Sequence, residues 1–134
     1  MNTTAAKDEL IEAAARARDS ALAHFSQFRV GAALKTADGA IYTGCNIESA
    51  TYGLTMCAER VAIWKALSEG VRQFTRIAVV ADTGRLTPPC GSCRQIIWEF
   101  CGDVPVVLAN LSGEAETLHM SELLPRPFDE KFLR

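Results

Sequence analysis

The chain has 134 residues, of which 49% are hydrophobic, so it is long and apolar enough for one domain with a buried core. Its net charge of −2, with scattered Lys and Arg, excludes the basic face typical of nucleic-acid-binding domains. It has no run of 18 apolar residues, which argues against a membrane helix. Its first residues do not show the basic stretch followed by an apolar stretch that marks a secretory signal. We therefore expect a cytoplasmic protein, in which five cysteines favour metal binding or catalysis over disulfides.

The first part of the chain predicts a helix followed by a β-hairpin. Apolar residues recur at helical spacing over residues 5–22, and Thr4 is placed to cap this helix. Residues 29–36 and 40–45 have the composition of strands, and the glycine of the 38–39 turn between them tolerates a positive φ. We expect the helix to pack on one face of a sheet that contains this hairpin.

The middle of the chain predicts two buried elements. Residues 57–69 are apolar nearly all round, which indicates a buried helix, and Gly70 is placed to end it. Residues 74–82 contain an apolar run, typical of a central strand that is covered on both faces. The polar loop 46–55 between hairpin and helix is expected at the surface or along a site.

The last part of the chain continues the alternation of helix and strand. A helix is expected over about 91–101, strands over 104–111 and around 117–120, and a helical turn at 121–124. This order predicts a single domain over residues 1–134, of the three-layer α/β class, with a five-stranded sheet and helices on both faces.

Three cysteines suggest a metal site. Cys90 and Cys93 are three residues apart at the start of a predicted helix, and Cys57 begins another. Helix starts favour thiolate over thiol, and three thiolates can hold zinc while its fourth position takes water. A thioredoxin-like redox pair is the alternative for the Cys-x-x-Cys, and a core cysteine is the alternative for Cys57.

Charged residues beside these cysteines suggest catalysis. Glu59 is two residues from Cys57, and side chains of a first helical turn tilt toward the helix start, so its carboxylate can move the proton of a zinc-bound water. Arg60 and Arg94 closely follow the ligand segments and are expected to donate hydrogen bonds to the thiolates. The alternative for each arginine is a solvated charge on a helix surface.

A zinc site without catalysis is a separate possibility. In that case Cys45 or Cys101 would supply a fourth thiolate, zinc would have no open position, and the chain would serve as an interaction module. Glu59 would then have no task.

Two motifs match the zinc-dependent deaminase signature. The signature is His-x-Glu, or Cys-x-Glu, followed by Pro-Cys-x-x-Cys, and the chain has Cys57-Ala58-Glu59 and Pro89-Cys90-Gly91-Ser92-Cys93. Further similar segments are Phe25–Leu34, Gly44–Glu48 and Leu123–Pro125. With these segments, nearly the whole chain resembles the small, homotetrameric cytidine deaminases of nucleoside salvage.

The resemblance implies a role for each matching position. It implies one zinc per subunit on the three cysteines, Glu59 as proton shuttle, and a mixed sheet in the order 2-1-3-4-5. It also implies a set of substrate-binding residues. These are Phe28 against the pyrimidine, Asn46 and Glu48 at the ribose, Ala58 at the base through its backbone, and Phe128 reaching a neighbouring subunit's site.

The implied activity is the hydrolytic deamination of cytidine and 2′-deoxycytidine to uridine and 2′-deoxyuridine in pyrimidine salvage. Asn46 and Glu48 are two residues apart on an extended segment, so both can face one side and bind sugar hydroxyls. Without the resemblance, Asn46 would be interpreted as a turn residue and Glu48 as a solvated loop charge. A carboxylate at the sugar would repel a phosphate, which favours a free nucleoside. A nucleoside antibiotic such as blasticidin S, or another cytosine derivative, is the alternative substrate.

Overall fold

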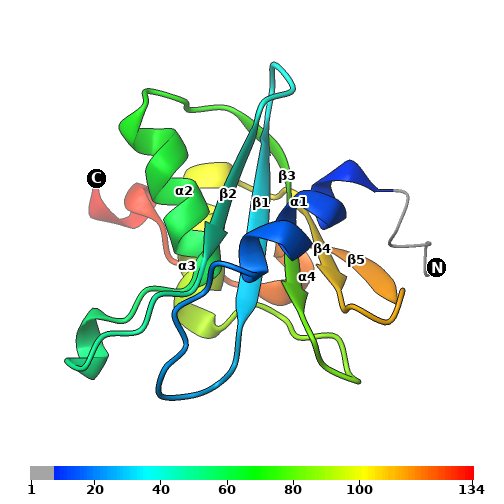
Figure 1. The fold of residues 1–134 in the computed structure, drawn as a ribbon. Coiled ribbons are helices and arrows are strands. Elements are labelled where there is room, and N and C mark those ends of the chain that lie inside the picture. Colours follow the sequence, from blue (N-terminus) through cyan, green and yellow to red (C-terminus); the bar gives the residue numbers. More distant parts are fainter. Residues whose placement is uncertain (1–7) are drawn as a thin grey trace.

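The fold is given by a computed structural model, which describes residues 8–134. A mixed sheet of five strands in the order β2-β1-β3-β4-β5 forms its centre (Figure 1). In chain order the elements are α1 (Glu9–Arg18), β1 (Val30–Thr36), β2 (Ile41–Cys45), the 3₁₀ helix η2 (Tyr52–Leu54), α2 (Ala58–Ser68), β3 (Phe74–Ala81), α3 (Gly91–Cys101), β4 (Pro105–Ala109), β5 (Ala115–His119), α4 (Met120–Leu123) and the 3₁₀ helix η3 (Glu130–Leu133). The expected strand order is confirmed.

Helices cover both faces of this sheet, which confirms the three-layer prediction (Figure 1). Successive residues of a strand face opposite sides, and β3 shows this division clearly. Ala78 and Val80 pack with the apolar face of α1, whereas Ile77 and Val79 pack with α2 and α3. Residues 77–81 are all buried, so β3 is the covered central strand that its composition predicted.

The first helix is shorter than its apolar pattern suggested. The Asp8 carboxylate caps α1 by accepting the backbone N–H of Leu10 at 2.9 Å, and the same carboxylate pairs with Arg76 of β3 at 2.9 and 3.0 Å. The cap expected at Thr4 lies outside the described residues. The helix ends at Arg18, because the following chain turns so that Leu22 can bridge to the segment after β2.

The hairpin turns at Gly39, which has the expected positive φ of 91°. Beyond β2, two extended segments run out from the body of the molecule and carry η2 at their tip (Figure 1). Ile47 and Met56 join these segments by backbone hydrogen bonds of 2.9 and 3.0 Å. The polar loop is therefore a projection whose base leads directly into α2.

Helix α2 lies very close to strand β2 at Gly44. A Cβ atom at this position would stand 2.4 Å from the carbonyl oxygen of Ala58 and 2.6 Å from the backbone nitrogen of Ala62. The expectation that α2 is buried all round is wrong, because Trp64 and Lys65 are exposed, and Lys65 donates to the Thr43 carbonyl at the sheet edge. Only the face toward the sheet and α3 is closely covered.

Within residues 8–134, none of the helices combines the length and the apolar character that crossing a membrane requires.

Candidate active site

Two helix starts bring three thiols together. Cys57 is the N-cap of α2 and Cys90 is the N-cap of α3, while Cys93 lies in the first turn of α3. The three sulfur atoms lie within 4.8 Å of one another, and those of Cys57 and Cys90 are 3.9 Å apart. Tetrahedral Zn–S bonds of about 2.3 Å would place sulfurs about 3.8 Å apart, so this donor set fits zinc.

Hydrogen bonds favour the ionised form of Cys57. The thiol of Cys93 and the guanidinium of Arg60, whose Nη2 is 3.4 Å from the Cys57 sulfur, lower the pKa of Cys57 well below its usual value. Partial positive charge at the start of α2 acts in the same direction. These contacts therefore favour the thiolate form of Cys57, which is the form that binds a metal.

Arg94 does not approach the thiols in the way we expected. Its Nε donates to the Pro89 carbonyl at 2.8 Å, and its Nη1 donates to the Leu123 carbonyl at 3.0 Å. These two bonds tie the segment just before Cys90 to the end of α4. The expected hydrogen bond from Arg94 to a thiolate is therefore wrong, and Arg94 instead stabilises the segment that carries Cys90.

A fourth thiolate is not available to this cluster. Among residues 8–134, the group that can hold a metal comprises Cys57, Cys90 and Cys93, and neither Cys45 nor Cys101 belongs to it. Cys45 ends β2 and Cys101 ends α3, where burial raises the pKa of the Cys101 thiol to about 12. The hypothesis of a structural zinc site with four cysteines is therefore wrong.

Glu59 supplies a buried carboxylate beside the thiols. It lies in the first turn of α2, is 4% exposed, and lines a cavity together with Cys57 and Cys90. Burial raises the pKa of Glu59 to about 7. A carboxyl group with a pKa near 7 can both accept and donate a proton at neutral pH.

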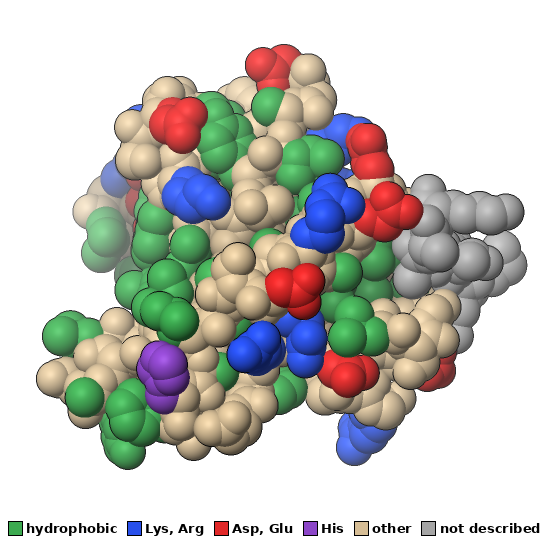
Figure 2. All heavy atoms as spheres, viewed as in Figure 1, with side chains coloured by type: hydrophobic (Ala, Val, Ile, Leu, Met, Phe, Trp, Pro, Cys, Tyr) green, Lys and Arg blue, Asp and Glu red, His purple; other side chains and the backbone are tan. Residues whose placement is uncertain are grey.

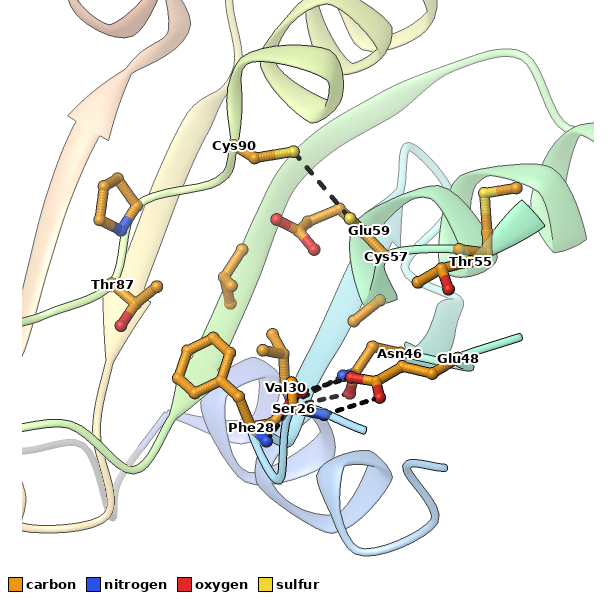
Figure 3. Close-up of a pocket in the computed structure, with 14 residues that line it drawn as sticks. Ser26, Phe28, Val30, Asn46, Glu48, Thr55, Cys57, Glu59, Thr87 and Cys90 are labelled. Atoms are coloured by element: carbon orange, nitrogen blue, oxygen red, sulfur yellow. Dashed lines mark hydrogen bonds between the residues drawn. The ribbon is translucent and has the colours of Figure 1, made fainter. Parts of the chain in front are cut away.

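The cavity has a volume of about 280 Å³ and is mostly apolar. In Figure 3, Glu59 lies between the Cys57–Cys90 pair at one end and Asn46 with Glu48 at the other. The described residues that line the cavity are Ser26, Phe28, Val30, Asn46, Glu48, Thr55, Met56, Cys57, Ala58, Glu59, Val79, Thr87, Pro88 and Cys90. Residues that the sequence placed in three separate segments thus share one space.

Asn46 and Glu48 both hold the chain that precedes β1. The Asn46 amide, 8% exposed, accepts from Val30 N at 2.9 Å and donates to the Phe28 carbonyl at 2.7 Å. The Glu48 carboxylate accepts the backbone N–H of Phe25 at 2.9 Å and that of Ser26 at 3.0 Å. The two side chains face one side, as their spacing predicted, and they fix the segment that brings Phe28 to the cavity.

Several lining residues were not singled out from the sequence. Ser26 and Thr87 add hydroxyl groups, and Pro88 and Met56 add apolar surface. Thr87 and Pro88 directly precede the Pro-Cys-x-x-Cys motif, so their position beside a ligand segment was an available signal. Ser26 carries no such signal, because its place depends on the path of the loop before β1.

Phe128 lies away from this cavity of its own chain. Its ring stacks on Phe132 with ring centroids 5.5 Å apart, and its carbonyl accepts Gln95 Nε2 at 2.7 Å. The tail therefore packs along α3, and the reach of Phe128 into a neighbouring subunit stays a prediction.

Comparison with known proteins gives a consistent result. A family model described as the cytidine and deoxycytidylate deaminase zinc-binding region matches residues 4–109. A cytidine deaminase of Sporosarcina psychrophila is 50% identical, over 94% of this chain and 93% of its own. A blasticidin-S deaminase of Bacillus cereus is 32% identical, over 87% of this chain and 88% of its own.

Solved structures agree with the sequence relatives. The crystal structure of a cytidine deaminase from Burkholderia pseudomallei superposes with a TM-score of 0.87 at 47% identity, covering 90% of this chain and 97% of that one. The thiol cluster, the sheet order and these matches lead to one assignment. The chain belongs to the family of zinc-dependent cytidine and deoxycytidylate deaminases.

Proposed function

We propose that the protein hydrolytically deaminates cytidine and 2′-deoxycytidine, giving uridine and 2′-deoxyuridine with release of ammonia, as a step of pyrimidine salvage. The observation that carries this proposal is the buried carboxylate of Glu59 in the same cavity as Cys57 and Cys90. Relatives named cytidine deaminase, 50% and 53% identical to this chain, support the choice of substrate.

Glu59 moves the protons of the reaction. Cys57, Cys90 and Cys93 would hold zinc, which would supply a Lewis acid that lowers the pKa of a coordinated water. Glu59 accepts a proton from the attacking water and delivers it to N3 of the ring as the C4–O bond forms. Glu59 then takes the second proton of the former water from the oxygen on C4 and delivers it to the amino nitrogen. The C4–N4 bond breaks, the C4 carbonyl forms, and ammonia leaves. A pKa raised by burial suits a group that must accept and donate in one cycle.

The far end of the cavity binds the nucleoside. The Phe28 ring packs on the pyrimidine, and the Ala58 backbone hydrogen-bonds to the base. Asn46 and Glu48 bind the sugar: the amide keeps one N–H and one acceptor position beyond its two bonds to the chain, and the carboxylate is an acceptor for a hydroxyl. All four residues line the cavity that also contains Glu59.

A free nucleoside is a better substrate than its phosphate. Glu48 places negative charge at the sugar end, and the described lining residues include no Lys or Arg that could pair with a phosphate. We expect cytidine and 2′-deoxycytidine to be deaminated at least about a hundredfold more efficiently than CMP, because like charges at close range cost about 3 kcal/mol at an effective dielectric near 20.

The direct test is a panel of cytidine, 2′-deoxycytidine, CMP and blasticidin S, with ammonia release measured for each. The similarity to a Bacillus cereus blasticidin-S deaminase makes that antibiotic the rival substrate. Turnover of blasticidin S without turnover of cytidine would replace the proposal, and equal efficiency on CMP would contradict the role of Glu48.

The protein is proposed to act as a homotetramer in the cytoplasm. The projection after β2 exposes apolar side chains: Tyr52 is 73% and Leu54 is 70% exposed, and Phe25 contacts Tyr52 edge-on with ring centroids 5.5 Å apart. Hydrophobic side chains gather at the tip of this projection (Figure 2). Such exposed apolar patches are typical of contacts between subunits. In an assembly of several subunits, Phe128 of one subunit would reach the cavity of a neighbour. Five free thiols suit a reducing compartment.

A further inference from the structure

The hydroxyl of Ser26 joins two side chains of the cavity. Its Oγ donates to Oε2 of Glu48 and accepts the backbone N–H of Phe28 at 3.0 Å. Ser26, Phe28 and Glu48 all line the cavity (Figure 3). Because the Phe28 N–H occupies an acceptor position of the Ser26 oxygen, the hydroxyl hydrogen is left to point at Glu48.

Residues 25 and 26 together leave Glu48 one acceptor position. An ionised carboxylate has about four such positions. On Oε1, two are filled by the N–H groups of Phe25 and Ser26, at 2.9 and 3.0 Å. On Oε2, one is filled by the Ser26 hydroxyl. The remaining acceptor position is on Oε2. Because Glu48 lines the cavity, a ligand in the cavity can fill this position with a hydrogen-bond donor.

The backbone between Ser26 and Phe28 adopts an unusual conformation. Gln27 has a φ of 61°, in the left-handed region that glycine favours. Among residues 8–134, no other non-glycine residue has a positive φ. Its N–H donates to the Ala23 carbonyl and its side chain donates to the His24 carbonyl, at 3.0 and 3.1 Å. Strained residues of this kind gather at binding sites, and here the reversal lets both neighbours reach the cavity.

We propose that Ser26 is a positioning residue for the nucleoside: its hydroxyl orients the Glu48 carboxylate so that the remaining acceptor of Oε2 faces a sugar hydroxyl. This inference rests on the proposed function. The hydrogen bond from Ser26 is also the largest cause that holds the pKa of Glu48 below its usual value, which keeps the group an acceptor. The ligand class is a cytosine nucleoside with a free sugar hydroxyl.

The test is a double-mutant cycle with Ser26→Ala, Glu48→Gln and the double variant, measured as KM and kcat for cytidine. If Ser26 acts through Glu48, Ser26→Ala raises KM about tenfold in the wild-type background and less than about twofold in the Glu48→Gln background, with kcat within about twofold in both. Ser26→Thr keeps the hydroxyl, and Ser26 is exposed enough for a methyl group, so this variant is expected to restore KM.

Ser49→Ala is a matched control. Ser49 Oγ accepts the backbone N–H two residues ahead, from Thr51, at 3.0 Å, but it has no bond to a carboxylate. This variant is expected to keep KM and kcat. Equal effects of Ser26→Ala in both backgrounds, or an unchanged KM, would overturn the role of Ser26 while leaving the proposed function intact. A wild-type protein without activity on cytidine would overturn both.

Discussion

Cys57 and Glu59 face the same space although they are two positions apart on one helix. Cys57 is the N-cap, with extended backbone, and Glu59 lies in the first turn, so both side chains reach beyond the start of α2. Arg60, one residue further, donates to the Cys57 sulfur at 3.4 Å. One helix start thus places a metal-ligating thiol, the carboxylate proposed to carry protons and the arginine that bonds to the thiol close together.

Arg60 is expected to set the reactivity of the metal centre. Three thiolates would give bound zinc an excess of negative charge, and the hydrogen bond from Arg60 to Cys57 would offset part of it. In Arg60→Gln, kcat for cytidine should fall about tenfold while one zinc per chain remains, since the three ligands are untouched.

Arg72→Gln is the control for this variant. Arg72 lies beyond the opposite end of α2 and donates to the carbonyls of Leu67 and Val71. We expect it to keep kcat, with metal content measured alongside turnover. An Arg60→Gln protein with wild-type kcat would show that the thiolates need no charge relief from this residue.

At the scale of elements, the site depends on where α2 and α3 begin. Both helices begin next to their ligand cysteines, and both lie on the same face of the sheet. Gly44 of β2 permits this arrangement for α2, because the Ala58 carbonyl and the Ala62 nitrogen occupy the space of a side chain there. A close contact between a strand and a helix therefore sets the position of Cys57 and Glu59.

Replacement of Gly44 by Ala is expected to displace the start of α2. The new Cβ would meet backbone atoms at 2.4 and 2.6 Å, which cannot move aside as a flexible side chain would. We expect the free energy of unfolding to drop by about 2 kcal/mol or more, together with weaker zinc binding. Gly84→Ala is the control, since its Cβ would have no atom within 4 Å. Equal melting temperatures for both variants would contradict the close contact.

Local patterns in the sequence predicted most of these elements. The Pro88-Pro89 pair and the apolar run of residues 77–81 placed the start of α3 and the central strand within a residue or two. Features that depend on distant partners were missed. Asp8 caps α1 while paired with a strand 68 residues away, and Arg94 binds a carbonyl 29 residues away. The loop that contains Ser26 turns at Gln27, and glutamine is not a residue type that predicts a turn.

At the scale of the whole molecule, the cavity adjoins a hollow beside the projecting loop. Ser26 and Glu48 line both this cavity and a shallower hollow beside Phe25 and Tyr52. Tyr52 of the projection and Phe25 therefore lie near Glu48, at the end of the cavity that we propose binds the sugar. A neighbouring subunit that covers them would also close the binding site.

We predict a tetramer in solution, with a mass of four times 14.6 kDa, about 58 kDa. Light scattering coupled to size-exclusion chromatography measures this mass directly. Tyr52→Lys is expected to lower the mass and raise KM for cytidine together, because a buried charge opposes assembly and the site loses its cover. A monomeric wild-type protein with full activity would contradict the proposal.

The most direct test of the central claim is the zinc content and cytidine turnover of Glu59→Gln. The amide keeps the shape of the buried side chain but cannot carry a proton, so we predict one zinc per chain, an unchanged fold and a loss of turnover of at least about a thousandfold. Glu116→Gln, at an exposed position on β5, controls for the substitution itself and should retain activity. Turnover in Glu59→Gln within about tenfold of wild type would contradict the account, because the deamination would then proceed without its proton carrier.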